Sequence, residues 1–293
     1  MKILVTGGCG LLGASITNHL SEYEAIALDR DVSPRGRKVN GYKIVGDCYD
    51  REGMAQIVDG VKPEVVIHLA AESIIKDCDD NPANAIDTNL TGLTNMLLAS
   101  REVERFVFIS SSFVYGDFQY TPTEGHPKNP KGIYGGTKYA GEILTKTFCN
   151  RYGIEWVIVR PSAVYGATDI NKRVVQVLLE NALQGKPLVL EGANSKLDFT
   201  YLDDAVEGIC LASLSGFKNE AFNITRGEGR SLTELAGIIQ NLIPCEIIEG
   251  KENGLRPKRG ALDITAARCR LGYNPQWSLE NGVKKYLEWM MAQ

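Results

Sequence analysis

Short apolar runs alternate with amphipathic stretches through the first two thirds of the chain. Five runs rich in Val, Ile, Leu and Phe predict strands at residues 3–5, 25–28, 65–68, 106–109 and 157–159. The stretches between them predict helices at residues 11–22, 51–59, 84–101 and 134–152. Strands that are apolar on both faces need cover on both sides of their sheet. The alternation therefore predicts an α/β fold built on a doubly wound parallel sheet.

The pattern changes after about residue 166, where the expected elements are shorter and mixed. They are a helix near residues 173–184, a strand near 188–190 and a helix at 203–214. Ser231 and Glu234 have the spacing of a capping box, which predicts a helix as far as residue 242, and Ser278 is expected to cap the last helix. We therefore expect a Rossmann-type dinucleotide-binding domain, residues 1–165 and 198–228, and a smaller C-terminal α/β substrate-binding lobe, residues 166–197 and 229–293.

Composition narrows the class of protein. The chain has 293 residues, of which 44% are hydrophobic and 23% charged, as in water-soluble globular proteins. A net charge of -4 argues against a nucleic-acid partner. The seven cysteines are far apart and form no CxxC pair, so neither a disulfide framework nor a zinc or other metal site is expected. No apolar run approaches the ~20 residues of a membrane helix, and glycines interrupt the N-terminal run where a signal peptide would continue, so we expect a cytoplasmic protein.

A glycine-rich sequence joins the first predicted strand to the first predicted helix. Gly7 allows a tight turn, Gly10 lets the backbone approach a pyrophosphate, and Gly13 lets the helix pack closely on the sheet. The N–H groups of the helix start would then bind the phosphates. The spacing GxxGxxG is that of the short-chain dehydrogenase superfamily. A purely structural strand-to-helix turn is the alternative explanation.

Asp29 stands at the end of the second predicted strand. Its carboxylate can accept hydrogen bonds from the ribose diol of an adenosine and would repel a 2′-phosphate, so NAD is favoured over NADP as the cofactor. Arg30, Arg35 and Arg37 lie nearby and weaken that preference. The alternative for Asp29 itself is a solvated turn residue.

Tyr134 and Lys138 are four residues apart, and this spacing places them on one face of a helix. Such a pair is common on exposed helix surfaces. Here it follows the glycine-rich turn, Asp29, and three serines, residues 110–112, that close a predicted strand. A phenol titrates near pH 10, but a neighbouring ammonium favours the phenolate, which can take a proton from a sugar hydroxyl while hydride leaves for a nicotinamide. A serine hydroxyl beside it can hydrogen-bond the alcohol and the carbonyl that it becomes.

Many short motifs resemble, in order and over nearly the whole chain, the NAD-dependent epimerase/dehydratase family of extended short-chain dehydrogenases. The motifs are Gly7-xx-Gly10-xx-Gly13, Asp29, Gly46-Asp47, His68-Leu-Ala-Ala-Glu-Ser73, Asn89-Leu-Thr-Gly92, Ser110-Ser-Ser-Phe-Val-Tyr-Gly116, Tyr134-Gly-Gly-Thr-Lys138, Arg160-Pro-Ser-Ala-Val-Tyr-Gly166, Asp198-Phe-Thr-Tyr-Leu-Asp-Asp204, Arg256-Pro with Leu262-Asp263, and Leu271-Gly-Tyr-Asn-Pro with Ser-Leu-Glu280. The resemblance implies a nucleotide-diphosphate sugar as substrate and tightly held NAD. It also implies a homodimer joined through the helices near residues 84–101 and 134–152.

The same resemblance assigns residues to roles. Ser111 becomes the catalytic hydroxyl, with Tyr134 and Lys138, because it lies five residues before Gly116. The expected cofactor-binding residues are Gly7, Gly10, Leu11, Leu12, Gly13, Asp29, Arg30, Asp47, Cys48, Leu69, Ala70, Ala71, Tyr134 and Lys138. The expected substrate-binding residues are Ser112, Phe113, Arg173, Lys196 and Arg256. Arg256 would clasp the substrate pyrophosphate, and its alternative is a surface arginine.

Some positions depart from the pattern of the family. Dehydratases of the family carry an Asp-Glu pair directly after the catalytic hydroxyl residue, whereas Ser112 and Phe113 stand here. Glu72, within the motif His68-Leu-Ala-Ala-Glu-Ser73, is a feature shared with dehydratases, but it lies in a different loop from the expected acid pair. Ala163 replaces a usual Asn, and Leu197 replaces an Arg that normally contacts the substrate phosphates, for which Lys196 offers a substitute charge.

These departures rank the possible functions. A nucleotide-sugar 4-epimerase, which oxidises C4 transiently, comes first. A 4-dehydrogenase or 4-keto-reductase acting on the same carbon comes second, and a 4,6-dehydratase ranks below both. A non-catalytic regulator that senses NAD is the remote alternative, because such sensors generally lack the Tyr/Lys pair that is present here.

Overall fold

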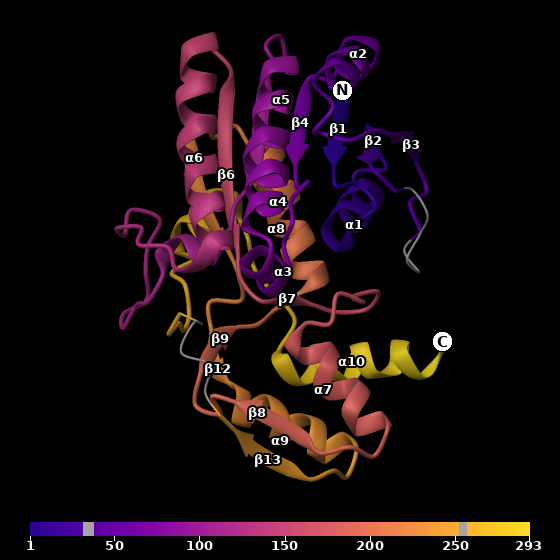
Figure 1. The fold of residues 1–293 in the computed structure, drawn as a ribbon, viewed down its shortest axis with the longest axis vertical. Coiled ribbons are helices and arrows are strands. Elements are labelled where there is room, and N and C mark those ends of the chain that lie inside the picture. The colour runs from indigo at the N-terminus through magenta and orange to yellow at the C-terminus, as the bar shows by residue number, and fades with distance from the viewer. Residues whose placement is uncertain (32–37, 252–256) are drawn as a thin grey trace.

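A computed structural model describes residues 1–31, 38–251 and 257–293 of the chain (Figure 1). Its central sheet has seven parallel strands in the order β11-β6-β5-β4-β1-β2-β3. The strands are β1 (Lys2–Thr6), β2 (Glu24–Asp29), β3 (Tyr42–Val45), β4 (Val65–His68), β5 (Arg105–Ile109), β6 (Glu155–Pro161) and β11 (Glu220–Ile224). The order reverses direction between β1 and β4, which confirms the doubly wound fold. In such sheets ligands bind beyond the carboxyl ends of the strands at this reversal.

Helices cover both faces of the sheet, as the apolar strands predict. Helices α1 (Leu11–His19) and α8 (Leu202–Leu214) pack on one face, and α2 (Arg51–Val61), α5 (Gly92–Ala99) and α6 (Gly132–Tyr152) on the other. Side chains along β1 alternate between the two cores: Ile3 and Val5 lie with α1 and α8, and Leu4 lies with α2 and α5.

A third core lies beyond the carboxyl ends of the strands, in the lower part of Figure 1. It is formed mainly by α7 (Val174–Leu183), α9 (Leu232–Leu242), α10 (Leu279–Met291) and the parallel pair β8 (Leu188–Glu191) and β13 (Ile247–Gly250). Two short pairs of strands lie outside the central sheet. They are β7 (Val164–Tyr165) with β10 (Thr200–Tyr201), and β9 (Lys196–Asp198) with β12 (Gly229–Ser231). The capping box of Ser231 and the cap of Ser278 are both present.

Several elements differ from the sequence prediction. The helix expected at 84–101 is divided into α4 (Pro82–Ile86), a π-helical turn η1 (Asp87–Thr91) and α5, and it is preceded by the short helix α3 (Ile75–Asp80). The first helix ends at His19, not at residue 22. Strands β3 and β11 have no counterpart in the prediction. Most of β3 is exposed, so it lacks the apolar signal of a central strand.

Two further turns complete the described chain: the 3-10 turn η2 (Ser112–Tyr115) and the π-helical turn η3 (Ala267–Leu271). Turn η3 comes from a stretch that the sequence places in the C-terminal lobe. Its Ala267, together with Ile264 and Tyr273, packs in the core beside α8. Part of the C-terminal segment thus packs in the core beside α8, whereas α9 and α10 contribute to the third core.

Candidate active site and cofactor cleft

The glycine-rich turn after β1 has a backbone that admits no larger residue at two of its three predicted positions. Gly7 has φ +65°, and a Cβ on it would lie 2.9 Å from the amide nitrogen of Ala70. A Cβ on Gly13 would lie 2.1 Å from the carbonyl oxygen of Gly7, so Gly13 packs on the turn itself. Gly8, to which the sequence assigned no role, lies against β2, where a Cβ would come within 2.6 Å of the Cβ of Ala27.

The start of α1 is suited to an anion. Gly10 is its N-cap and offers no side-chain hydrogen bond, so the first N–H groups of α1 have no capping partner from that residue. In the part of the chain that the structure describes, a Cβ built on Gly10 would approach the carbonyl oxygen of Gly7 at 3.1 Å and, apart from its chain neighbours, no other atom within 4 Å. Leu11 and Leu12 follow as the first residues of the helix. A close backbone, free N–H groups and the positive end of a helix dipole fit a dinucleotide pyrophosphate.

The ends of β2 and β3 bring the predicted adenosine-side residues to the same edge of the sheet. Asp29 Oδ2 accepts a hydrogen bond of 2.9 Å from the N–H of Cys9, which ties the glycine-rich turn to β2 and to the neighbouring Arg30. Asp47 follows β3, and its Oδ1 accepts from the N–H of Tyr49 at 2.9 Å. Asp29 therefore supports the turn directly, a role that the sequence did not indicate.

Cys48 is buried beside these residues. Burial raises the pKa of its thiol to about 12, with the charge of Asp47 adding to the effect. Its carbonyl oxygen accepts a hydrogen bond of 3.0 Å from Asn95 Nδ2 on α5. Cys48 is thus an inert, neutral thiol. Arg35 and Arg37, which bear on the choice between NAD and NADP, lie outside the described residues.

The loop after β4 lies directly against the glycine-rich turn. The N–H of Leu69 donates to the carbonyl oxygen of Thr6 at 3.1 Å, and the N–H of Ala70 donates to Thr6 Oγ1 at 3.3 Å. The same Oγ1 is 2.8 Å from Nδ1 of the buried His68. Leu69 and Ala70 are therefore held at the topological reversal of the sheet, and Ala71 follows them.

Asn89 connects this loop to α6, and the sequence analysis gave it no role. Its Oδ1 accepts from the N–H of Glu72 at 2.7 Å, and its Nδ2 donates to the carbonyl oxygen of Glu72 at 3.1 Å and to Thr137 Oγ1 at 3.0 Å. Asn89 belongs to the π-helical turn η1. Such turns often occur at functional sites.

Tyr134 and Lys138 lie on the first turns of α6, and Ser111 follows β5. Lys138 is buried, and its Nζ donates to the carbonyl oxygen of Ile109 at 2.9 Å. Burial lowers the pKa of Lys138 to about 8. The Nζ is 6.0 Å from the centre of the Tyr134 ring. The three predicted catalytic residues therefore converge at the carboxyl end of β5.

The surroundings of Tyr134 within the described chain raise the pKa of its phenol. Burial raises it, and this outweighs a hydrogen bond with Ser111 and the positive charges of Arg173 and Arg259, all of which lower it. Lys138, which the sequence analysis expects to favour the phenolate, directs its ammonium to the carbonyl oxygen of Ile109 and lies 6.0 Å from the centre of the Tyr134 ring. In the chain alone Tyr134 is a neutral phenol.

A buried ion pair supports the strand end that carries Ser111. Glu142 and Arg160 are each 1% exposed and are joined by two contacts of 2.7 Å. Glu142 Oε1 also accepts from the hydroxyl of Ser110 at 2.7 Å. Since Glu142 lies one turn beyond Lys138 on α6, the pair fixes the end of β5 against α6.

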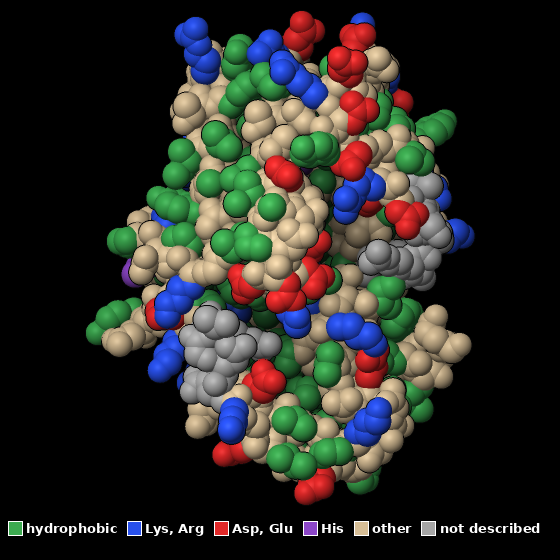
Figure 2. Space-filling view, in the orientation of Figure 1, with side chains coloured by type: hydrophobic (Ala, Val, Ile, Leu, Met, Phe, Trp, Pro, Cys, Tyr) green, Lys and Arg blue, Asp and Glu red, His purple; other side chains and the backbone are tan. Residues whose placement is uncertain are grey.

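The N-terminus of α6 is held by another element. Its N-cap, Lys131, provides no side-chain cap, and Asp79 of α3 accepts a hydrogen bond of 3.3 Å from the N–H of Ile133. Figure 2 shows acidic side chains gathered over α3, where Asp77, Asp79 and Asp80 are exposed. The carboxylate of Asp79 complements the helix dipole one residue before Tyr134.

The substrate side of the site contains an arginine that the sequence analysis missed. Arg259 Nη1 donates to Ser112 Oγ at 2.9 Å, and its guanidinium lies 4.1 Å from the centre of the Phe113 ring. The hydroxyl of Ser112 donates to Ser162 Oγ at 3.1 Å. Phe113 in turn meets Tyr134 edge-on, with ring centres 5.5 Å apart. Ser112 and Phe113 thus link Arg259 to Tyr134.

The remaining predicted substrate residues are spread around this point. Arg173 is the N-cap of α7 and lies 3.5 Å from Asp169 Oδ2. Lys196 lies on β9, in the wall of a hollow of about 490 Å³ that Lys258 and Arg259 also line. Arg256 lies outside the described residues. Leu197 packs toward the third core and offers no charge in place of the usual arginine.

The model of the NAD dependent epimerase/dehydratase family matches residues 3–225. The chain belongs to this family. NAD is accordingly the cofactor, and the glycine-rich turn with the uncapped start of α1 fits its phosphates.

Individual relatives agree with the assignment. A Methanocaldococcus jannaschii protein named as a candidate UDP-glucose 4-epimerase is 34% identical, and the match covers 98% of each chain. The Thermotoga maritima UDP-glucose 4-epimerase with UDP-glucose has a TM-score of 0.94 and 30% identity, covering 100% of this chain and 99% of that one. The Bacillus cereus UDP-glucuronic acid 4-epimerase, in complex with UDP-glucuronic acid and NAD, has a TM-score of 0.91 and 25% identity with the same coverage. Relatives also include the Escherichia coli dTDP-glucose 4,6-dehydratase 1, 27% identical over 100% of this chain and 93% of that protein.

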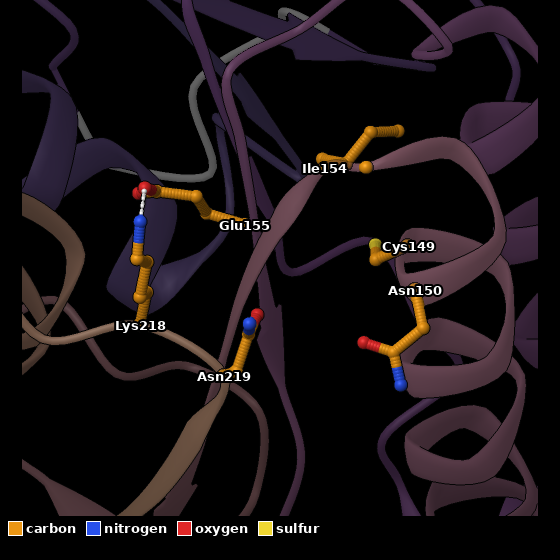
Figure 3. Close-up of a pocket in the computed structure, with 7 residues that line it drawn as sticks. Cys149, Asn150, Ile154, Glu155, Lys218 and Asn219 are labelled. Carbon is orange, nitrogen blue, oxygen red and sulfur yellow. Dashed lines mark hydrogen bonds and ion pairs between the residues drawn. The ribbon is translucent and has the colours of Figure 1, made fainter.

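Another pocket of this epimerase/dehydratase family member lies far from these residues. It has a volume of about 210 Å³ and is found where β6 and β11 begin, at the amino edge of the sheet. Figure 3 shows Lys218 directed at Glu155, to which it is paired at 2.9 Å, with Asn219 beside them. Its charged side chains are already paired, and it is opposite the edge that carries Tyr134.

Metal clusters and membrane-spanning helices are both absent from the described ranges, residues 1–31, 38–251 and 257–293. No group of three or more His, Cys, Asp or Glu side chains there is arranged to hold a metal ion. No helix there is long and apolar enough to cross a membrane.

Proposed function

We propose that this enzyme is a nucleotide-sugar 4-epimerase. The observation that carries the proposal is the convergence of Ser111, Tyr134 and Lys138 beside the glycine-rich turn, with Ser112 and Phe113 in place of an acid pair. These groups suit the removal and return of one proton and one hydride at a single carbon.

Each residue has a defined task in the proposed reaction. Ser111 hydrogen-bonds the C4 hydroxyl and orients it toward Tyr134. The positive charges of Lys138 and of a bound nicotinamide would favour the phenolate of Tyr134, which takes the proton of that hydroxyl and later returns it. Bound NAD supplies the acceptor and donor for the hydride. Lys138, held by Ile109, keeps a positive charge near the Tyr134 ring and is placed to contact the cofactor ribose. Rotation of the keto-sugar between the two transfers would invert the carbon.

The surroundings of Ser111 argue against water elimination. A 4,6-dehydratase needs an acid and a base near C5 and C6 of the sugar. The hydroxyl of Ser112 forms hydrogen bonds with Ser162 and Arg259, and the Phe113 ring packs on Tyr134. Neither residue has a carboxylate that could act as the acid or the base. Glu72 Oε1 accepts a hydrogen bond from the N–H of Ile74 within its own loop.

We further propose a uridine-diphosphate sugar as the substrate, because several relatives act on or bind such sugars. The cations Arg173 and Lys196, and Arg256 by its sequence motif, are the groups proposed to contact it. Residues 1–165 and 198–228 are proposed to bind the dinucleotide, and residues 166–197 and 229–293 to bind the sugar nucleotide. The third core gives most of the second group a packing unit of its own.

A homodimer is proposed through α5 and α6, which stand side by side in Figure 1. Ile143 and Leu144 on α6 are 49% and 39% exposed, and Ile86, just before η1, is 44% exposed. Light scattering should give about twice the mass of the chain. Replacing Ile143 and Leu144 by Lys and Glu should give the monomer mass. The seven free thiols of the chain suit a reducing compartment, and we propose the cytoplasm.

The reaction type is tested by following cofactor and sugar together. Purified enzyme with catalytic NAD and either UDP-glucose or UDP-glucuronate should form the C4 epimer, detected by chromatography, with no net change in absorbance at about 340 nm. Consumption of added NAD or its reduced form in step with the sugar would identify a dehydrogenase or reductase instead. A 4-keto-6-deoxy product would identify a dehydratase. Binding of NAD without turnover of any nucleotide sugar would favour a sensor.

A further inference from the structure

We propose that Arg259 is a specificity-determining residue that binds a carboxylate on C5 of the sugar, so that the preferred substrate is a nucleotide hexuronate. The inference rests on the proposed 4-epimerase function. It begins from the contacts of Arg259, which donates to Ser112 Oγ at 2.9 Å and stacks 4.1 Å from the Phe113 ring centre.

The position of Arg259 relative to Ser111 decides which part of the sugar it meets. Ser112 directly follows Ser111, the residue proposed to hold the C4 hydroxyl, and Phe113 contacts the Tyr134 ring at 5.5 Å. In a pyranose, C3 and C5 are bonded to C4, whereas C1, which carries the diphosphate, lies across the ring. A guanidinium anchored at Ser112 is therefore close to the substituents of C3 and C5. Of the common substituents there, the oxidised C6 carboxylate matches a guanidinium in charge and in its two-pronged geometry.

Other cations are available for the diphosphate. The hollow that Arg259 lines is also lined by Lys196 and Lys258, by the loop at residues 192–195 and by Glu249 and Gly250. Lysine is a suitable point charge for phosphate oxygens. The diphosphate can therefore lie along the lysines while Arg259 serves the sugar.

The segment that carries Arg259 is fixed on both sides, which specificity requires. The N–H of Lys258 donates to Asp117 Oδ1 at 2.7 Å, and the carbonyl oxygen of Lys258 accepts from the N–H of Phe118 at 3.0 Å. On its other side Arg259 forms an antiparallel bridge with Lys196 of β9. The charge of Arg259 also lowers the pKa of Tyr134, as expected of a cation near the reacting hydroxyl.

The test compares two substrates that share the nucleotide and the diphosphate. For the NAD-loaded enzyme, kcat/KM for UDP-glucuronate should exceed that for UDP-glucose by roughly tenfold to a hundredfold, the value of one charge-assisted pair. Arg259→Met should remove that preference, and Arg259→Lys should retain part of it. Lys258→Met is the matched control, since it removes a neighbouring cation from the same hollow. Lys258→Met should change kcat/KM for UDP-glucuronate and kcat/KM for UDP-glucose by the same factor.

Three results would overturn the inference. A native enzyme that epimerises UDP-glucose better than UDP-glucuronate would contradict it and leave the proposed 4-epimerase intact. Equal loss on both substrates in Arg259→Met, with an unchanged melting temperature, would assign Arg259 to the diphosphate or to the support of Phe113. If neither sugar is turned over, the proposed function fails. The inference is then tested separately by the rise in melting temperature that UDP-glucuronate and UDP-glucose produce in the native enzyme and in Arg259→Met. The inference is upheld if Arg259→Met loses the melting-temperature rise produced by UDP-glucuronate and keeps that produced by UDP-glucose. It is rejected if the variant responds to both ligands as the native enzyme does, or loses both responses.

Discussion

Neutralising Glu142 should destabilise the fold more than any exposed charge change. Glu142 and Arg160 are both 1% exposed, and Glu142 receives contacts of 2.7 Å from Arg160 Nε, Arg160 Nη2 and the Ser110 hydroxyl. Burial alone would lower the pKa of Arg160, but its hydrogen bonds and attraction to Glu142 raise it, so the guanidinium stays charged. Glu142→Gln would leave that buried charge without its counter-ion, which costs about 3–5 kcal/mol.

The measurement is urea or thermal unfolding followed by far-UV circular dichroism. At about 2–4 °C per kcal/mol for a chain of this size, the expected fall in melting temperature is roughly 6–20 °C. The control is Glu180→Gln, which removes a carboxylate paired with the exposed Lys172 and should barely move the midpoint. Replacing both charges, Glu142→Leu with Arg160→Met, should recover most of the lost stability, because no unpaired charge remains.

The reasoning would be refuted by a loss below about 1 kcal/mol in Glu142→Gln, or by a double variant no more stable than the single one. A second readout concerns the site. Because Ser110 precedes Ser111, loss of the Glu142 contact should lower kcat for the sugar while the dissociation constant for NAD stays near its native value. Unchanged kcat would separate the ion pair from the placement of Ser111.

Three further predictions concern the catalytic tyrosine, the glycine-rich turn and a buried histidine. Tyr134→Phe should abolish epimerisation while leaving NAD affinity nearly native by calorimetry, and turnover at the native rate would exclude Tyr134 as the proton acceptor. Gly13→Ala should weaken NAD binding by tenfold or more, because its Cβ would lie 2.1 Å from the Gly7 oxygen, whereas Gly237→Ala, with nothing within 4 Å, should leave the dissociation constant unchanged. Burial, aided by the charge of Lys138, lowers the pKa of His68 from 6.5 to about 3. Between those pH values the unfolded chain binds a proton that the folded chain does not, so stability falls as pH drops through this window. His68→Phe should show a flatter dependence in urea titrations, and parallel curves would contradict the assignment.

The central strands were predictable because each is apolar on both faces. β3 carried no such signal, since Tyr42 and Val45 are exposed at the edge of the sheet. The division of the helix at 84–101 was equally hidden. The π-helical turn there serves the contacts of Asn89 with Glu72 and Thr137, which are distant in sequence.

The order of Ser111, Tyr134 and Lys138 could be read from motifs, but the residues that support them could not. Glu142 is a charged residue within a helix, and sequence alone would place it on a solvated face. Arg259 lies three residues after the arginine that the family motif favoured. Its proximity to Tyr134 depends on the pairing of Lys258 with residues 117–118 and of Arg259 with β9. Such information is tertiary and has no local pattern.

Helix α6 explains how one fold can keep its redox chemistry while its substrate changes. Thr137 is bound to Asn89 and so to the loop after β4, Lys138 to the end of β5, and Glu142 to Ser110 and Arg160. Lys138 and Glu142 share a face of the helix because they are four residues apart, and Thr137 precedes Lys138 in the chain. Helix α6 thus fixes the loop after β4, the pair of Tyr134 and Lys138, and the end of β5 with its serines to one rigid element. Arg259, by contrast, comes from the C-terminal segment and reaches the site through Ser112 and Phe113. Changes in that segment can alter which sugar is bound without moving Tyr134.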